Sequence, residues 1–186
     1  MWREKSEAVP IEWERGPSLS VVTPHKIVHI PISRPGGPGA SMEIFEILKN
    51  QLYQSGAPEE AADWQPIRDR NIDVVVDLYG TLDPGVPTEP NSILYLFWPI
   101  EDAAVLPDVH ILDVLTDTVV RLIALGHKVL VHCHRGKSRS GLINAIVVMK
   151  MLKLDGNAAI DIIRQGRPGA LGNQTFVEYL QGLRAT

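Results

Sequence analysis

Residues 128–154 constrain the fold more than any other part of the chain, because two different hydrophobic patterns follow each other there. Residues 128–132 (KVLVH) have the β-branched composition of a buried strand. Residues 138–154 are almost wholly apolar over a length that suits a central helix. A strand that leads through a short loop into a helix is typical of α/β domains, so this stretch predicts a layered α/β fold.

The other hydrophobic patterns continue the alternation of strands and helices. Apolar and β-branched runs predict strands over residues 26–32, 72–78 and 93–98. Apolar residues at helical spacing predict helices over residues 41–54, 58–70, 109–125, 157–165 and 173–183. Residues 1–20 are polar and of mixed charge, and we expect them to form an irregular arm ahead of one domain over residues 21–186.

Composition excludes several classes of protein. Cys133 is the only cysteine in 186 residues, which excludes an internal disulfide and a zinc site with several cysteine ligands. The net charge of −4 argues against a dominant nucleic-acid-binding surface. No apolar run is long enough for a membrane span, and residues 1–16 lack the apolar core of a signal peptide. A cytoplasmic location is therefore expected.

Charge is distributed unevenly along the chain. No acidic residue lies between Thr118 and Leu154, so this stretch carries +7 and the rest of the chain carries −11. The basic residues in it are Arg121, Lys128, Arg135, Lys137, Arg139, Lys150 and Lys153. Concentrated positive charge in an acidic protein predicts an anionic ligand. Two solvated helix faces are the alternative interpretation.

Cys133 occupies a position that suits a nucleophile. It lies between the predicted strand and the predicted helix of residues 128–154, at the end of a strand, where α/β sheets bind ligands. The free N–H groups and partial positive charge of a helix N-terminus favour both an oxyanion and a thiolate. Arg139 follows six residues later, and its planar guanidinium can hold two oxygens of a phosphate.

Other interpretations of this stretch are weaker. Residues 136–138 (GKS) imitate the end of a nucleotide-binding P-loop, but that motif requires a glycine where Val131 stands. His132 and His134 could form a metal pair, although no nearby carboxylate completes the ligand set. A merely buried cysteine is the remaining alternative, and the basic residues around Cys133 argue against it.

The motif His132-Cys133-x5-Arg139-Ser140 is similar to the signature of the protein tyrosine phosphatase superfamily. Gly136 stands where that signature has its central glycine. The variant resembles the dual-specificity branch of the superfamily and its phosphoinositide-directed relatives.

Two further segments resemble that branch. Residues 98–102 (WPIED) are similar to the loop that carries its general acid, and Arg167-Pro, Asn173 and Phe176 are similar to its C-terminal pattern. The likeness covers residues 72–183. It implies a three-layer protein tyrosine phosphatase-like fold, with a central, mostly parallel sheet flanked by helices, in one dual-specificity phosphatase-like catalytic domain.

The resemblance implies a cysteine-dependent phosphatase that forms a phosphocysteine intermediate. Cys133 would attack phosphorus, and Arg139 and the loop backbone would hold the phosphate oxygens. Asp102 would protonate the leaving oxygen, with Glu101 and Asp108 as alternatives. The loop residues expected to bind phosphate are His134, Arg135, Gly136, Lys137, Ser138 and Arg139.

Further residues are given supporting roles by the same resemblance. Ser140 would hydrogen-bond the Cys133 sulfur and make it a better leaving group, while His132 and Asn173 would order the loops. No metal or other cofactor is implied, and a phosphate or sulfate ion is expected in the loop. For Asp77 and Asp83, which follow the strand at 72–78, we favour a structural role.

The substrate stays open between two classes. Protein phosphotyrosine is the leading substrate, with phosphoserine and phosphothreonine as further candidates, so a phosphorylated protein is the expected partner. His134, Arg135 and Lys137 resemble the basic loops of enzymes that act on phosphoinositides or inositol polyphosphates, which makes a small anionic phosphate ester the alternative. A phosphate-binding pseudophosphatase is less favoured, because the proposed catalytic residues are all present.

Overall fold

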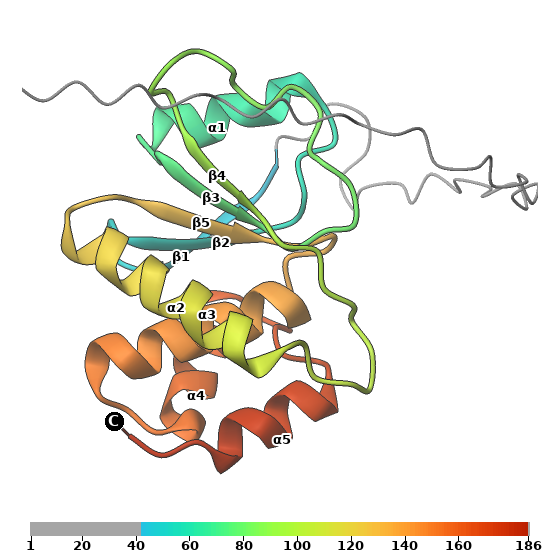
Figure 1. The fold of residues 1–186 in the computed structure, drawn as a ribbon, viewed down its shortest axis with the longest axis vertical. Helices are drawn as coiled ribbons and strands as arrows, with labels where there is room; N and C mark the ends of the chain where they lie inside the picture. Colours follow the sequence, from blue (N-terminus) through green and yellow to red (C-terminus); the bar gives the residue numbers. More distant parts are fainter. Residues whose placement is uncertain (1–41, 186) are drawn as a thin grey trace, which may run out of the picture. The chain divides into compact units, whose positions relative to one another are not determined.

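The computed structural model describes residues 42–185, which form a five-stranded sheet with helices on both faces (Figure 1). The strands are β1 (Ile44–Leu48), β2 (Leu52–Ser55), β3 (Val74–Asp77), β4 (Leu94–Phe97) and β5 (Val129–His132). Their spatial order is β1-β2-β5-β3-β4. Only β1 and β2 pair antiparallel, and the pairs β2–β5, β5–β3 and β3–β4 are parallel.

The parallel strands end at the same edge of the sheet. Ser55, His132 and Asp77 stand opposite one another in register, and Asp77 is paired with Phe97 of β4. In open α/β sheets this carboxyl edge is where ligands bind. The register therefore brings the start of the 133–139 loop beside residues that lie far away in sequence.

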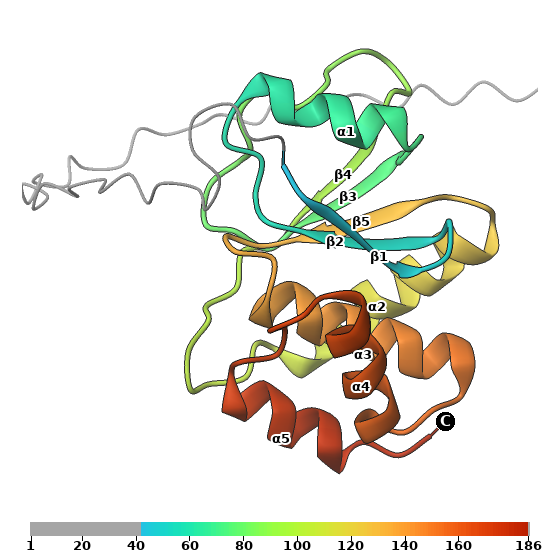
Figure 2. The same ribbon diagram turned by 180° about the vertical axis from the view of Figure 1, so that it is seen from behind.

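The helices divide between the two faces of the sheet. A 3-10 turn, η1 (Ala61–Asp63), leads into α1 (Trp64–Asp69), which covers one face. The other face carries α2 (Val109–Ala124), α3 (Ser138–Leu152), α4 (Gly156–Gly166) and α5 (Gln174–Gly182) (Figures 1 and 2). The predicted three-layer α/β fold is confirmed.

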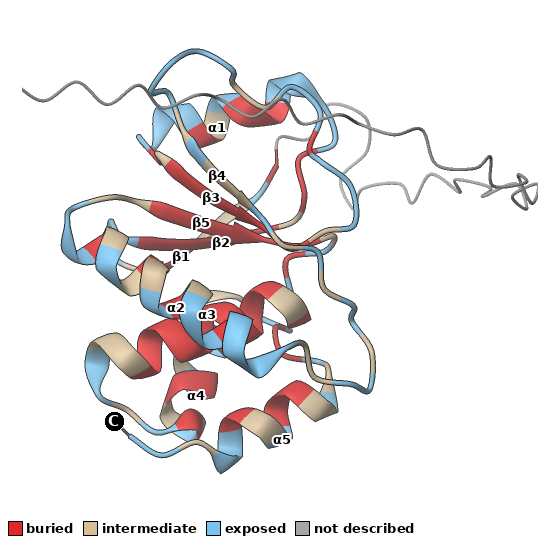
Figure 3. Cartoon of the chain, in the orientation of Figure 1, coloured by how far each residue is buried: buried red, intermediate tan, exposed pale blue. Residues whose placement is uncertain are grey.

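Alternation along the strands creates two hydrophobic cores. Val75 and Leu130 pack with Trp64 and Ile67 beneath α1. The side chains that point to the other face of the sheet, such as Val74, join the core beneath α3. Residues 140–149 of α3 are all buried, as Figure 3 shows for the middle of this helix. The almost wholly apolar run in the sequence is thus explained by a helix enclosed by the sheet and by α2, α4 and α5.

The helix predicted over residues 41–54 is wrong. This segment forms the β1–β2 hairpin, in which Asn50 adopts a left-handed conformation with φ of 57°. Asparagine tolerates this conformation better than most residues, and the Glu46 carboxylate accepts a hydrogen bond from the Asn50 N–H at 2.7 Å. The apolar spacing of Ile44, Leu48 and Leu52 fitted a helix by chance, because the turn interrupts the alternation expected of a strand.

The other predicted elements within the described residues are present with modest shifts at their ends. The strand at 26–32 and the arm at 1–20 lie outside the described residues. No helix in the described part of the chain has the length and hydropathy to cross a bilayer.

Candidate active site

Hydrogen bonds from two parts of the chain, residues 54–57 and residues 167–171, hold the loop after β5 in place. The Gly136 carbonyl accepts hydrogen bonds from Gln54 Nε2 at 3.1 Å and from Arg167 Nε at 3.2 Å. The His134 carbonyl accepts from the Ala57 N–H, and the Lys137 carbonyl accepts from the Leu171 N–H, both at 3.3 Å. The loop conformation is therefore determined by β2 and by the segment between α4 and α5, not by the loop sequence alone.

Cys133 lies at the base of this loop and is only 1% exposed. Its sulfur is 3.4 Å from the hydroxyl oxygen of Ser140, which is buried in the first turn of α3. The two residues are seven positions apart, so the loop folds back to bring them together. The structure thus places the predicted nucleophile against the predicted hydroxyl partner.

The Arg139 guanidinium reaches two neighbouring loops. Its Nη1 donates to the carbonyls of Ile100 at 3.2 Å and Leu78 at 3.4 Å. Its Nε is buried and makes no hydrogen bond with any described residue. A buried donor without an acceptor costs free energy, so an acceptor supplied by a ligand would be stabilised at this position.

Asp102 is exposed, and its loop is tied to the N-terminus of α5 through Asn173. Asn173 Nδ2 donates to Asp102 Oδ1 and to the Ala103 carbonyl, both at 2.9 Å, while its Oδ1 caps α5 by accepting from the Phe176 N–H. Glu101 is exposed on the same loop. Asp108 is engaged elsewhere, because its carboxylate accepts from the first N–H groups of α2.

His134 is covered by an aromatic ring. The Tyr79 ring stacks on it with 4.9 Å between centroids and an 8° angle between planes, and Arg139 Cζ lies 5.8 Å from the Tyr79 centroid. Burial, together with the positive charges of Arg135 and Arg139, lowers the pKa of His134. His134 therefore adds little positive charge at neutral pH, and the cations of the loop are Arg135, Lys137 and Arg139.

Four polar side chains form a cluster around His132, the residue before Cys133: Asp77, Asp83 and His132 are buried, and Tyr95 is half-buried. Tyr95 Oη lies 2.6 Å from Asp77 Oδ2 and 2.9 Å from Asp83 Oδ2, and it accepts a hydrogen bond from the Asp83 N–H at 3.3 Å. His132 Nε2 lies 2.9 Å from the same Asp83 oxygen and 3.7 Å from Asp77 Oδ1, although neither ring nitrogen makes a hydrogen bond of regular geometry. His132 thus has two carboxyl groups as its polar neighbours.

Contacts with the Tyr95 hydroxyl account for the approach of the two carboxyl groups in this cluster. Among the described residues, Asp77, Asp83 and His132 are the one set of three carboxylate and imidazole groups whose ligand-type atoms lie within 4.8 Å of one another. The Tyr95 hydroxyl already bridges the two carboxylates. The structural role expected for Asp77 and Asp83 agrees with their burial.

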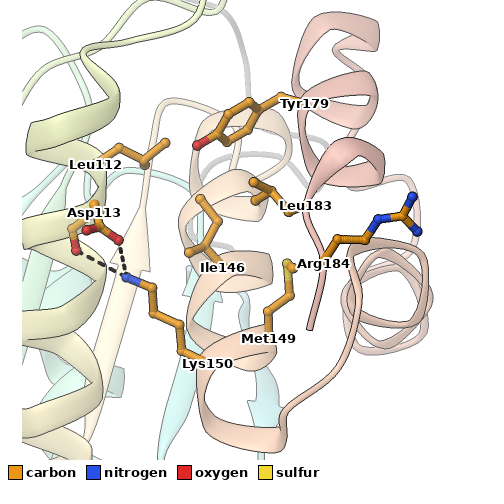
Figure 4. A pocket seen from close by; sticks show the side chains of 8 residues that line it. All are labelled: Leu112, Asp113, Ile146, Met149, Lys150, Tyr179, Leu183 and Arg184. Atoms are coloured by element: carbon orange, nitrogen blue, oxygen red, sulfur yellow. Dashed lines mark hydrogen bonds and ion pairs between the residues drawn. The ribbon is translucent and has the colours of Figure 1, made fainter. Parts of the chain in front are cut away.

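A cavity lies away from the catalytic loop, between α2, α3 and α5 (Figure 4). Its volume is about 140 Å³, and it is lined by Leu112, Asp113, Ile146, Met149, Lys150, Tyr179, Leu183 and Arg184. Lys150 donates to Asp113 Oδ1 at 2.6 Å and to Asp117 Oδ1 at 2.7 Å. Burial alone would lower the pKa of Lys150, but its hydrogen bonds to the two carboxylates raise it.

The +7 stretch is therefore only partly a ligand site. Lys150 is neutralised by acidic residues of α2, and Lys128 donates to the Arg70 carbonyl. Lys153 ends α3 in a left-handed conformation. The net charge of consecutive residues groups these lysines with the loop, because it leaves out the charges that other segments bring close to them.

Several residues of the site were not predicted from the sequence. Gln54, Tyr79 and Tyr95 contact the loop or the cluster from β2, from the segment after β3 and from β4. A polar residue near the end of a parallel strand, the signal that marked Asp77 in the sequence, could also have identified Gln54 had β2 been predicted as a strand. The roles of the predicted residues stay predictions, although the structure brings Cys133 and Ser140, and Asp102 and Asn173, together.

Comparison with known proteins places these features in context. The model of the dual specificity phosphatase catalytic domain matches residues 52–185. Among solved structures, Tk-PTP in its active form is 25% identical, with a TM-score of 0.63 over 74% of this chain and 95% of that chain. The PTP-2 phosphatase of Cydia pomonella is 25% identical, with a TM-score of 0.64 over 75% and 89%.

A third structure, PTPMT1 in complex with PI(5)P, is 19% identical, with a TM-score of 0.63 over 72% of this chain and 89% of that chain. At this identity the likeness concerns the fold alone. None of the curated proteins compared with the chain matches it.

Proposed function

The chain belongs to the dual specificity phosphatase family, and we propose that it hydrolyses phosphate monoesters through a phosphocysteine on Cys133. The observation that carries the proposal is the buried Arg139 Nε, which has no hydrogen-bond acceptor among the described residues and lies at the end of the loop that begins with Cys133. A phosphate oxygen is the acceptor that an arginine fork accommodates best. The backbone N–H groups of residues 134–139 and the N-terminus of α3 would add stabilisation of negative charge.

The first step transfers the phosphoryl group to sulfur. The Cys133 thiolate attacks phosphorus, the P–S bond forms and the bond from phosphorus to the leaving oxygen breaks. The carboxylic acid of Asp102 gives its proton to that oxygen. Arg139 holds equatorial oxygens of the transferring group, whose charge is greatest in the transition state.

The second step returns the enzyme to its starting state. Water attacks phosphorus, the Asp102 carboxylate accepts a proton from that water, and the P–S bond breaks to release phosphate and the thiolate. The Ser140 hydroxyl, 3.4 Å from the sulfur, can donate a hydrogen bond as negative charge develops there. Asn173 supports both steps by its contacts with Asp102 and the Ala103 carbonyl.

We propose protein phosphotyrosine as the substrate class. The loop carries less excess positive charge than its sequence suggests, because the pKa of His134 is lowered by burial and by neighbouring arginines. Lys150 is paired with two carboxylates away from the loop. The exposed side chains of Arg135 and Lys137 are what favours the second candidate, a highly anionic inositol phosphate.

A comparison of substrates at fixed ionic strength tests this choice. We expect a higher kcat/KM for a phosphotyrosine peptide than for an inositol polyphosphate. Replacing both Arg135 and Lys137 by glutamine should lower hydrolysis of the inositol polyphosphate severalfold more than that of the peptide. The inositol polyphosphate carries more negative charge, so it loses more attraction when the two positive charges are removed. Arg121→Gln, on the exposed face of α2, is the control for a general charge effect. A reversed substrate order would transfer the proposal to inositol phosphates.

Replacing Asp102 by asparagine tests the general acid. The rate should fall by about 10²- to 10⁴-fold for an alkyl phosphate and much less for an aryl phosphate with an acidic phenol, since a good leaving group needs no proton. The measurement is kcat/KM across phosphate esters whose leaving groups differ in pKa. Glu101→Gln is the matched control on the same loop, and a leaving-group-dependent loss in that variant would contradict the assignment to Asp102.

A further inference from the structure

In the cluster of Asp77, Asp83, Tyr95 and His132, one phenol hydroxyl lies against two carboxyl groups. The two contacts cannot both be hydrogen bonds if both carboxyl groups are ionised. Tyr95 Oη lies within hydrogen-bond distance of both carboxyl groups, at 2.6 Å from Asp77 and 2.9 Å from Asp83. A phenol carries one hydrogen and can donate to only one of them. The other contact needs a hydrogen that belongs to a carboxyl group, since two lone pairs facing each other at this distance repel.

The neighbouring groups indicate which carboxyl holds that hydrogen. Asp83 Oδ2 lies 2.9 Å from both Tyr95 Oη and His132 Nε2, so two polar groups stand against this one oxygen. The Asp77 Oδ1 accepts from the Tyr79 N–H at 2.7 Å, which leaves Asp77 Oδ2 as the oxygen directed at Tyr95. Burial raises the pKa of Tyr95 far above its usual range, so the phenol keeps its own hydrogen.

We propose that Asp77 acts in its neutral, protonated form as a positioning residue for the catalytic loop. Its carboxylic acid donates to Tyr95 and Tyr95 donates to Asp83, whose carboxylate lies 2.9 Å from Nε2 of His132, the residue before Cys133. The consequence for catalysis rests on the proposed function, whereas the proton on Asp77 does not.

This chain of contacts connects both sides of the site. Through its N–H, Tyr79 is tied to Asp77, and its ring covers His134. The Leu78 N–H donates to the His132 carbonyl at 3.1 Å, and the Leu78 carbonyl accepts from Arg139 at 3.4 Å. A second negative charge beside Asp83 would repel it and displace the segment after β3, on which Tyr79 and Leu78 lie.

The pH dependence follows from the surroundings of Asp77. The groups facing it are His132 from β5, Tyr95 from β4 and Asp83 from the segment after β3. Burial raises the pKa of Asp77 and outweighs the lowering by His132 and by the hydrogen bonds from Tyr95 and Tyr79. The folded chain thus binds this proton more tightly than the unfolded chain, so its contribution to stability is complete at low pH and is lost as pH rises through the folded pKa.

Asparagine at position 77 mimics the protonated state. Its amide nitrogen can donate to Tyr95 Oη while its oxygen keeps the bond from the Tyr79 N–H, so every contact has its hydrogen at any pH. We would measure the unfolding equilibrium of wild type and Asp77→Asn between about pH 4 and pH 9. Between the unfolded and folded pKa values of Asp77, the ratio of the two unfolding constants should change by up to about tenfold per pH unit, in favour of Asp77→Asn.

Asp161→Asn, a substitution at an exposed aspartate of α4, is the matched control, and its ratio of unfolding constants should change far less with pH than that of Asp77→Asn. A ratio for Asp77→Asn that is equally flat would overturn the proposal. If Asp77→Asn does not fold, the infrared band of a protonated carboxyl in the wild type decides instead. The pH at which half of this band is lost should lie above about 3.9, the pKa of an exposed aspartate. A midpoint at or below that pH would overturn the proposal.

The catalytic consequence has a separate readout. The pH profile of kcat/KM for an aryl phosphate should lose part of its alkaline decline in Asp77→Asn, and coincident profiles would overturn the positioning role. A wild type without Cys133-dependent hydrolysis would instead refute the proposed function, while the unfolding measurements would still decide where the proton is.

Discussion

Replacing Cys133 by serine is expected to reduce hydrolysis of an aryl phosphate by about 10⁴-fold or more. The serine hydroxyl is protonated near neutral pH and is a far weaker nucleophile than a thiolate. The substitution is close to isosteric, so the buried contact with Ser140 and the hydrogen bonds that hold the loop should persist. Single-turnover rates, together with calorimetric measurement of inorganic phosphate binding, would separate lost chemistry from lost binding.

The lone cysteine offers an independent control for this prediction. Because the chain has no other cysteine, iodoacetate can alkylate thiol only at Cys133. Loss of activity should follow alkylation one to one, and inorganic phosphate should slow both. A Cys133→Ser protein that retains the wild-type rate would contradict the role of Cys133 as nucleophile. Phosphate binding that disappears with the sulfur would contradict the role of the remaining loop residues in holding the anion.

The parts of the fold that were predictable from sequence are those determined by local pattern. The β5–α3 unit is one such part, because a β-branched strand and a long apolar helix each carry their pattern within a few neighbouring residues. The predicted strands and helices from residue 72 onward share this property. The β1–β2 hairpin does not, because its pairing depends on a turn at Asn50 and on a parallel partner, β5, about 80 residues later.

The partners of the candidate site were hidden for the same reason. Gln54 and Gly136 are bonded across 82 positions, and Arg139 and Leu78 across 61. Cys133 and Arg139 could be identified because their spacing is a property of one loop. The residues that hold this loop in place are brought to it by sheet order and register, neither of which a local pattern contains.

The net charge of residues 118–154 overstated the positive charge near the loop, and the positions of the charged side chains show which of them belong to it. Only Arg135, Lys137 and Arg139 of the +7 stretch belong to the loop, and the carboxylates that neutralise Lys150 come from another helix. Conversely, two acidic residues, Asp77 and Asp83, lie buried against the residue that precedes the nucleophile. A proton on Asp77, as proposed above, would reduce the negative charge beside the anion-binding loop.

Replacing Gly136 by alanine is expected to have the second largest effect, because the loop has no room for a side chain there. The φ of Gly136 is 58°, and an added Cβ would stand 2.2 Å from the Ser55 carbonyl carbon and oxygen. These are backbone atoms of β2 and cannot rotate away, so the loop itself must move. The same movement would disturb the hydrogen bonds from Gln54 and Arg167 to the Gly136 carbonyl.

A displacement of about 1 Å in a catalytic loop costs on the order of 100-fold in rate, and we expect at least that loss in Gly136→Ala. The free energy of unfolding should fall by about 2–5 kcal/mol, from the left-handed conformation and the steric overlap together. Gly126→Ala is the matched control, because Gly126 has a φ of 95° but no atom within 4 Å of an added Cβ. It should show the conformational cost without loss of rate. Equal effects of the two substitutions on stability and rate would mean that contact with β2 does not determine the shape of the loop.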